Sequence, residues 1–296
     1  MIDKAADNGT LRLAAGDATL STADIEAYLQ RIGHEGPCRV DRQTLEALIA
    51  RHAAAIPFEN FEVLAGRVPS LELPALQRKL LGGGRGGYCY EQNSLLLAML
   101  QEIGFDARPL EARVRANVPP QVLTGRTHLA VRVVLCGEPV LVDVGFGGLA
   151  PLAPLSFDSR PQRCPDGAVY RLVPHGDATA LQIQTSHGWE DCYHVGPGTP
   201  QSVDLEMGNW YVATHPAAVL GNNLLVARAV DGGRLMLFNH LLTFRRASTG
   251  TLDQRTLATR AEFDDVLRDR FGLRIDAADL DRALAKLPGP AAGQGS

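Results

Sequence analysis

Long apolar runs, paired cysteines and a strong charge of one sign are all missing from this sequence, and each absence excludes a class of protein. No apolar segment approaches the roughly 18 residues of a membrane-spanning helix. The net charge of -4 gives no electrostatic case for binding nucleic acid or an anionic membrane. Residues 1–18 have mixed charge and no apolar centre, so we expect a loose extension here and no signal peptide.

The cysteines are odd in number, widely separated and never arranged as C-x-x-C pairs. This pattern argues against a disulfide framework and against a zinc site, so no metal is expected. Free thiols are natural in a reducing cytoplasm, which is the predicted compartment. The five residues are Cys38, Cys89, Cys136, Cys164 and Cys192.

At 296 residues the chain exceeds one typical apolar core, and we expect two or three lobes. Apolar residues at helical spacing fill the first third, where helices end at Gly33, before Pro57 and at Gly104, and another covers residues 73–80. From residue 107 the period changes to two, which is typical of an antiparallel sheet or small barrel. The expected strands there cover residues 110–116, 127–135, 140–146, 169–173 and 181–185.

The last third combines a short segment around residues 209–211, a hairpin and a helix. The hairpin joins residues 224–230 and 235–244, and a Thr259–Glu262 capping box starts the helix. Residues from 288 onward are rich in Gly, Pro and Ala and are expected to be disordered.

One stretch, residues 80–93, joins a glycine-rich loop to a helix, and Cys89 lies at the junction. Backbone N–H groups and the positive end of the helix dipole stabilise a thiolate there, and they can also hold an oxyanion. The glycines also satisfy G-x-G-x-x-G, but a helix precedes them where a dinucleotide fold needs a strand. A phosphate-binding P-loop is excluded because no Lys-Ser/Thr pair follows the glycines. The alternative that Cys89 is a buried structural cysteine stays open unless a partner base is found elsewhere in the sequence.

His128 is the strongest candidate for that base, because its strand neighbours one that carries Asp143 among apolar residues. A hairpin centred on Cys136-Gly137 puts Asp143 opposite Ala130, within diagonal reach of His128. A hairpin centred one residue later pairs Asp143 with Arg132 instead and leaves the histidine idle. Neither dipeptide is a strong turn signal, so the sequence pattern leaves both registers open.

The other histidines are weaker candidates. His52 is expected at the edge of its helix. Three lie in turn-like settings and should be solvated, namely His34, His175 and His187. Three lack a carboxylate on a matching strand, namely His194, His215 and His240, and no two histidines have metal-ligand spacing.

Several motifs together resemble the arylamine N-acetyltransferases over nearly the whole chain. The motifs are Phe58-Glu59-Asn60, Arg85-Gly86-Gly87-Tyr88-Cys89-Tyr90-Glu91-Gln92-Asn93, Thr127-His128-Leu129, Val142-Asp143-Val144-Gly145-Phe146-Gly147, Asn209-Trp210-Tyr211 and Thr214-His215-Pro216. The resemblance implies an α+β fold with a helical bundle over residues 1–106, an antiparallel β-barrel over 107–207, and a linker helix with an α/β lid over 208–296. It implies a papain-like triad of Cys89, His128 and Asp143, and hence the Cys136-Gly137 register.

The resemblance also implies acetyl-CoA as donor and an arylamine, arylhydrazine or N-hydroxyarylamine as acceptor. Thr127, Phe146 and Gly147 would line the donor side, while Phe58 and Val114 would line the acceptor side. Leu220 stands where the family has an aromatic pocket wall, and Ala218 where it has a hydroxyl. Three alternatives share these residues: an amide synthase fed by a carrier protein, a papain-like hydrolase, and a binding protein without catalysis.

Overall fold

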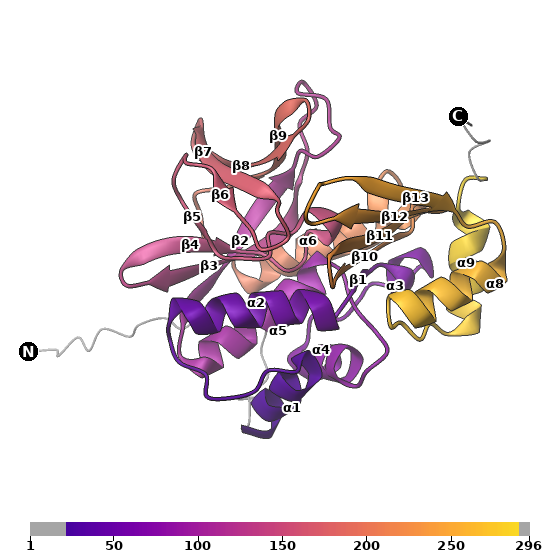
Figure 1. Cartoon of the computed structure of the whole chain (residues 1–296), viewed down its shortest axis with the longest axis horizontal. Helices are drawn as coiled ribbons and strands as arrows, with labels where there is room; N and C mark the ends of the chain where they lie inside the picture. Colours follow the sequence, from indigo (N-terminus) through magenta and orange to yellow (C-terminus); the bar gives the residue numbers. More distant parts are fainter. Residues whose placement is uncertain (1–21, 290–296) are drawn as a thin grey trace, which may run out of the picture.

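The structure, a computed structural model, describes residues 22–289 (Figure 1). The extension predicted for residues 1–18 and most of the predicted disordered tail lie outside these residues. The first part of the chain is helical, as predicted. Its elements are α1 (Thr22–Ile32), α2 (Arg42–Ala55), β1 (Phe58–Glu59), α3 (Phe61–Leu64), α4 (Leu73–Leu76), a π-helical turn (Gln77–Leu81) and α5 (Cys89–Ile103).

Local chemistry fixes the helix ends. The Asp41 side chain accepts a 2.8 Å hydrogen bond from the Thr44 amide and caps α2. Pro57 follows the end of α2, and Gly104 ends α5 in the left-handed region at φ 108°. These ends confirm the sequence-based predictions.

Within the described residues, the central part forms an eight-stranded antiparallel sheet in the order β5-β4-β3-β2-β9-β8-β7-β6. The sheet curls until β5 contacts β7, and this gives the barrel-like body at the upper left of Figure 1. A short 3₁₀ turn (Gly147–Leu149) follows β4. The strands are β2 (Asp106–Val114), β3 (Arg126–Leu135), β4 (Glu138–Val142), β5 (Leu155–Ser156), β6 (Gln162–Arg163), β7 (Val169–His175), β8 (Ala178–Thr185) and β9 (Gly188–Val195).

The β3–β4 hairpin has the register centred on Cys136-Gly137. Leu135 pairs with Glu138, and Val131 pairs with Val142. Both turn residues have positive φ, 52° and 84°, which is the combination of a type I′ turn. Arg132 pairs with Leu141, so the alternative register is excluded. The strand predicted to reach residue 146 was too long, because β4 ends at Val142 and frees the next residues to form the site.

A second sheet, at the right of Figure 1, has the order β1-β10-β11-β12-β13. The predicted hairpin is confirmed, but the expected strand over 235–244 was wrong, because Asn239 turns the chain at φ 50°. The Thr259–Glu262 capping box is confirmed. The elements are α6 (Ser202–Thr214), α7 (Val219–Asn222), β10 (Leu225–Val230), β11 (Gly233–Phe238), β12 (Leu241–Arg246), β13 (Leu252–Thr256), α8 (Arg260–Asp265), a π-helical turn (Val266–Arg270) and α9 (Ala277–Lys286).

Three large apolar clusters hold these parts together. The first packs α1, α2 and α5 against β3 and β4, the second fills the barrel-like sheet, and the third lies between the second sheet and α8 and α9. The predicted domain boundaries stay predictions, and the one after residue 207 would fall inside α6.

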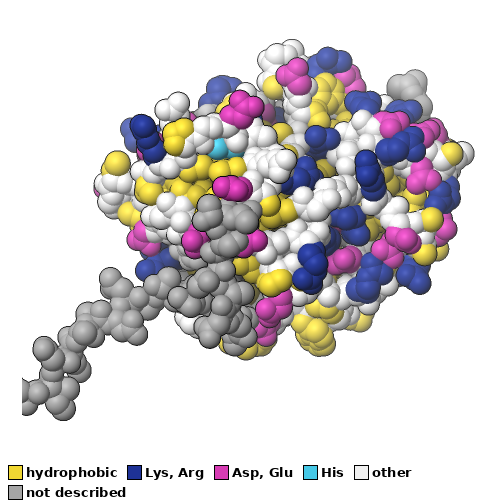
Figure 2. Space-filling model, turned by 90° about the horizontal axis from the view of Figure 1, so that it is seen from below, with side chains coloured by type: hydrophobic (Ala, Val, Ile, Leu, Met, Phe, Trp, Pro, Cys, Tyr) yellow, Lys and Arg dark blue, Asp and Glu magenta, His cyan; other side chains and the backbone are white. Residues whose placement is uncertain are grey.

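The surface seen in Figure 2 carries Lys and Arg interspersed with Asp and Glu. Among the helices of residues 22–289, none has the length and apolarity needed to span a bilayer.

Candidate active site

Cys89 is the first residue of α5, and its neighbours approach the backbone closely. A Cβ atom on Gly86 would overlap the carbonyl oxygen of Pro57. A Cβ atom on Gly145 would lie 2.7 Å from the Cα of Cys89. Glycine is therefore required at both positions, at residue 86 for the loop before the thiol to pack on Pro57 and at residue 145 for the loop after Asp143 to pack on Cys89. Cys89 itself is only 5% exposed.

His128 and Asp143 meet, as the chosen register requires. His128 Nε2 lies 2.7 Å from Asp143 Oδ2, and the two side chains are 2% and 0% exposed. The Cys89 side chain also acts on the imidazole, since it helps to raise the pKa of His128. Because Nε2 is occupied by the carboxylate, Nδ1 is the ring nitrogen left to face the sulfur.

The Asp143 carboxylate accepts further hydrogen bonds that the sequence pattern did not predict. Oδ1 accepts from Asn93 Nδ2 at 2.9 Å and from the Gly145 amide at 2.8 Å, while Oδ2 also accepts from the Tyr193 hydroxyl at 2.9 Å. A buried charge is tolerable when it is paired and fully hydrogen-bonded, and this one is both. Asn93 lies four residues after Cys89 on the same helix face, a spacing that the sequence does carry.

Aromatic rings fix the orientation of the imidazole. The ring centroids of Phe146 and Tyr193 each lie 4.8 Å from that of His128, and 4.9 Å from each other. These three packed rings exclude water from the His128–Asp143 pair.

The electrostatics favour an imidazolium. Burial alone lowers the pKa of His128, but the charge and hydrogen bond of Asp143, together with Cys89, raise that pKa to about 10. A histidine with that pKa keeps its proton at neutral pH, so the ring next to Cys89 is cationic. This cysteine, histidine and carboxylate arrangement can perform acyl transfer.

Comparisons with known proteins agree with this geometry. The N-acetyltransferase family model matches residues 41–280. An arylamine N-acetyltransferase of Mycolicibacterium smegmatis is 38% identical, covering 87% of this chain and 94% of its own, and the Escherichia coli enzyme is 36% identical, covering 87% and 91%. The chain belongs to the arylamine N-acetyltransferase family.

Solved structures of the family have the same fold. The Mycobacterium marinum arylamine N-acetyltransferase superposes with a TM-score of 0.84 at 35% identity and covers 88% of this chain and 99% of its own. A structure of that enzyme in complex with CoA gives a TM-score of 0.81 at 36% identity, covering 88% and 97%. The resemblance inferred from the motifs is thereby confirmed, and so is the α+β fold.

The residues predicted to line the pockets lie around Cys89 to different degrees. Phe58 and Leu220 pack in one apolar cluster with Cys89. The Thr127 carbonyl oxygen lies 4.0 Å from the Cys89 sulfur. A Cβ atom on Gly147 would lie 3.8 Å from the Phe58 ring, and Val114 lies on β2, where its backbone pairs with Tyr193.

Two expectations for the other histidines were wrong. His52 is fully buried, with Tyr28 Oη 3.0 Å from Nδ1 and Gln92 Oε1 2.6 Å from Nε2, and burial lowers its pKa to about 4. His34 has both ring nitrogens buried without a hydrogen-bond partner among residues 22–289. The carboxylate near His194 comes from its own strand, where Asp191 Oδ2 lies 2.8 Å from Nε2.

Within residues 22–289, no cluster of three or more His, Cys, Asp or Glu side chains could hold a metal ion.

Proposed function

We propose that this protein transfers an acetyl group from acetyl-CoA to an arylamine through an acetyl-Cys89 intermediate, with His128 as the base and Asp143 as the orienting acid. The observation that carries the proposal is the buried 2.7 Å pair of His128 and Asp143, whose imidazole is also affected by Cys89 at the N-terminus of α5. Membership of the family supports the same activity.

The first half-reaction loads the enzyme. The Cys89 thiolate attacks the thioester carbonyl carbon, a new carbon–sulfur bond forms, and the bond to the CoA sulfur breaks. The CoA thiolate leaves with the proton from the His128 imidazolium. Exchange between two thioesters is close to isoenergetic, so the acetyl-enzyme retains the activation of the donor. Backbone amides of the first turn of α5 would hold the oxyanion.

The second half-reaction uses the neutral imidazole. The acceptor nitrogen attacks the acetyl carbon, its proton passes to His128, and Cys89 leaves as a thiolate. The enzyme returns to its thiolate and imidazolium state, and ping-pong kinetics follow. Asp143 stays ionised throughout and keeps Nε2 of His128 engaged.

The pocket residues would divide between donor and acceptor. Thr127, Phe146 and Gly147 would contact the acyl and pantetheine groups, while Phe58, Val114 and Leu220 would contact the acceptor ring. The shared apolar cluster of Phe58, Leu220 and Cys89 supports the acceptor assignment. Arylhydrazines and N-hydroxyarylamines present a similar neutral nucleophile and are proposed as further acceptors.

Intact-protein mass spectrometry after addition of acetyl-CoA alone tests the proposal. We expect one acetyl group on Cys89, lost on addition of an arylamine with stoichiometric formation of the amide, and no label on Cys89→Ser. Rapid loss of the label to water would favour a hydrolase. Labelling only by a carrier-bound acyl chain would favour an amide synthase.

Free thiols at all five cysteines support a reducing location, and we propose the cytoplasm. The low net charge and the mixed surface charges support small molecules as the partners, without nucleic acid or membrane.

A further inference from the structure

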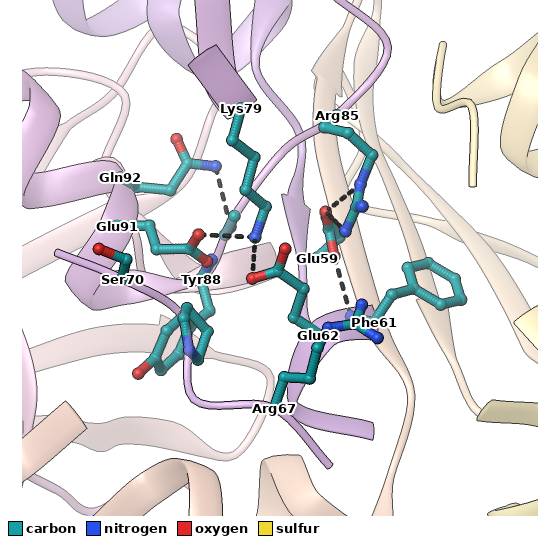
Figure 3. A network of polar contacts seen from close by, with 12 residues as sticks. Glu59, Phe61, Glu62, Arg67, Ser70, Lys79, Arg85, Tyr88, Glu91 and Gln92 are labelled. Atoms are coloured by element: carbon teal, nitrogen blue, oxygen red, sulfur yellow. Dashed lines mark hydrogen bonds and ion pairs between the residues drawn. The ribbon is translucent and has the colours of Figure 1, made fainter. Parts of the chain in front are cut away.

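A buried ionic network lies beside the first turn of α5, and the triad does not use it (Figure 3). It contains three carboxylates and two cations, and we call it the Lys79 cluster. Its members are Glu59, Glu62, Lys79, Arg85 and Glu91.

Lys79 lies at the centre of this cluster. Its ammonium is 2.6 Å from Glu91 Oε1 and 3.1 Å from Glu62 Oε2, and its side chain is only 13% exposed. Lys79 comes from the π-helical turn before the glycine-rich loop, so it joins the two ends of that loop across the network (Figure 3). Irregular turns of this kind are frequent at functional sites.

Glu91 connects Lys79 to the nucleophile. It lies two residues after Cys89 and is 2% exposed. Its second oxygen, Oε2, accepts a 3.1 Å hydrogen bond from the Tyr88 amide, the residue before Cys89. The Glu91 carboxylate therefore links the residue before Cys89 to the first turn of α5, while Lys79 holds its other oxygen.

The charges explain why the Glu91 carboxylate and the Lys79 ammonium depend on each other. Burial raises the pKa of Glu91, and Glu59 and Glu62 raise it further, while Lys79 lowers it. The same carboxylates outweigh burial at Lys79 and raise its pKa, so the ammonium stays charged. Without Lys79, the Glu91 carboxylate would be buried with no cation in direct contact.

We propose that Glu91, held by Lys79, is a positioning residue for Cys89 in the acetylation half-reaction. Its cap hydrogen bond to Tyr88 fixes the first turn of α5, and this fixes the direction of the sulfur toward His128. The proposal rests on the function proposed above.

The test compares three variants in single-turnover acetylation by acetyl-CoA, with rates referred to titrated active sites. Glu91→Ala removes the cap acceptor, Glu91→Gln retains an acceptor oxygen without the charge, and Glu62→Gln changes the other partner of Lys79 without touching α5. We expect Glu91→Ala to slow acetylation by between about tenfold and a hundredfold, the effect of a misplaced reacting group. Glu91→Gln should recover most of the rate, Glu62→Gln should stay within about twofold of wild type, and KM for acetyl-CoA should change little in all three.

The pH profile of Cys89 alkylation by iodoacetamide separates positioning from folding. A purely structural role would lower the melting temperature of Glu91→Ala but leave its profile and acetylation rate unchanged, and that result would overturn the proposal. Equal loss in Glu91→Gln and Glu91→Ala would overturn it too. If Glu91→Ala does not fold, Lys79→Met takes its place, with slow acetylation expected and recovery in Lys79→Arg. Absence of acetyl-Cys89 in the wild-type enzyme would instead contradict the proposed function.

Discussion

Replacing Asp143 by asparagine tests the geometry of the site most directly. The side chain keeps its size but loses its charge, and one acceptor oxygen becomes an NH₂ donor. Every neighbour of the carboxylate is a donor in the structure, namely the Asn93 amide, the Gly145 N–H, the Tyr193 hydroxyl and His128 Nε2. The new NH₂ group needs an acceptor, and where His128 supplies it, Nε2 accepts and the imidazole carries its proton on Nδ1 instead, on the side of Cys89.

The magnitude follows from the same contacts. The rise of the His128 pKa from 6.5 to about 10 corresponds to about 5 kcal/mol of preferential stabilisation of the imidazolium. Most of this is lost without the Asp143 charge, and burial then favours a neutral ring. With the wrong tautomer facing the thiol, we expect acetylation to fall by about 10³- to 10⁴-fold. Removing one partner of a buried pair should also cost about 3–5 kcal/mol of stability.

Stopped-flow acetylation, iodoacetamide alkylation across pH and thermal unfolding measure these effects. Tyr193→Phe is the matched control, because it removes one hydrogen bond to Oδ2 and keeps the charge. It should cost about 1.5–3 kcal/mol and leave Cys89 reactive at neutral pH. If Asp143→Asn alkylates at neutral pH within about threefold of wild type, the electrostatic reasoning is refuted, since losing most of about 5 kcal/mol of imidazolium stabilisation predicts a far larger effect.

Three further predictions come from single features of the structure. The His128 pKa is raised in the folded state, so its contribution to the free energy of unfolding is complete below about pH 6.5 and is lost as the pH rises through about 10. Urea titrations should show this decline in the wild type and not in Asp143→Asn. Gly86→Ala should place a methyl group on the Pro57 carbonyl, lowering the melting temperature and slowing acetylation, and wild-type behaviour in both would contradict the close packing. Leu220→Phe should improve kcat/KM for arylamines by about two- to tenfold through ring stacking, measured against an aliphatic amine as control, and an equal gain for both amines would argue against stacking.

The sequence predicted the chemistry of the site better than its surroundings. A glycine-rich loop, a cysteine at a helix start and a carboxylate among apolar residues are local signals. The β3–β4 register has no such local signal. Cys136 is an unusual residue for a positive φ of 52°, and nothing nearby in the chain indicates that it adopts this conformation. Motif resemblance supplied that choice, and the hydrogen-bonded pairs confirm it.

The elements that escaped prediction have physical reasons as well. β9 mixes charged and aromatic residues, so the two-residue period typical of a strand is hidden and the strand was not predicted. For that reason Tyr193 was not predicted as a partner of Asp143. β13 is exposed along its whole length and has no buried face to reveal. His52 looked peripheral because its partners, Tyr28 and Gln92, come from helices far away in the sequence.

The short strand β1 has a consequence for how the molecule assembles. Phe58 pairs with Ala227 on one side and bridges to Gly87 on the other, so two residues from the early chain form the edge of a sheet made almost entirely from the last third. The nucleophile loop is therefore anchored to a surface that does not exist until the ribosome has passed residue 230. Nascent or truncated chains that lack β10 would carry the thiol without the fixed loop that directs it, and reactivity toward the donor would arise only once β10 is in place.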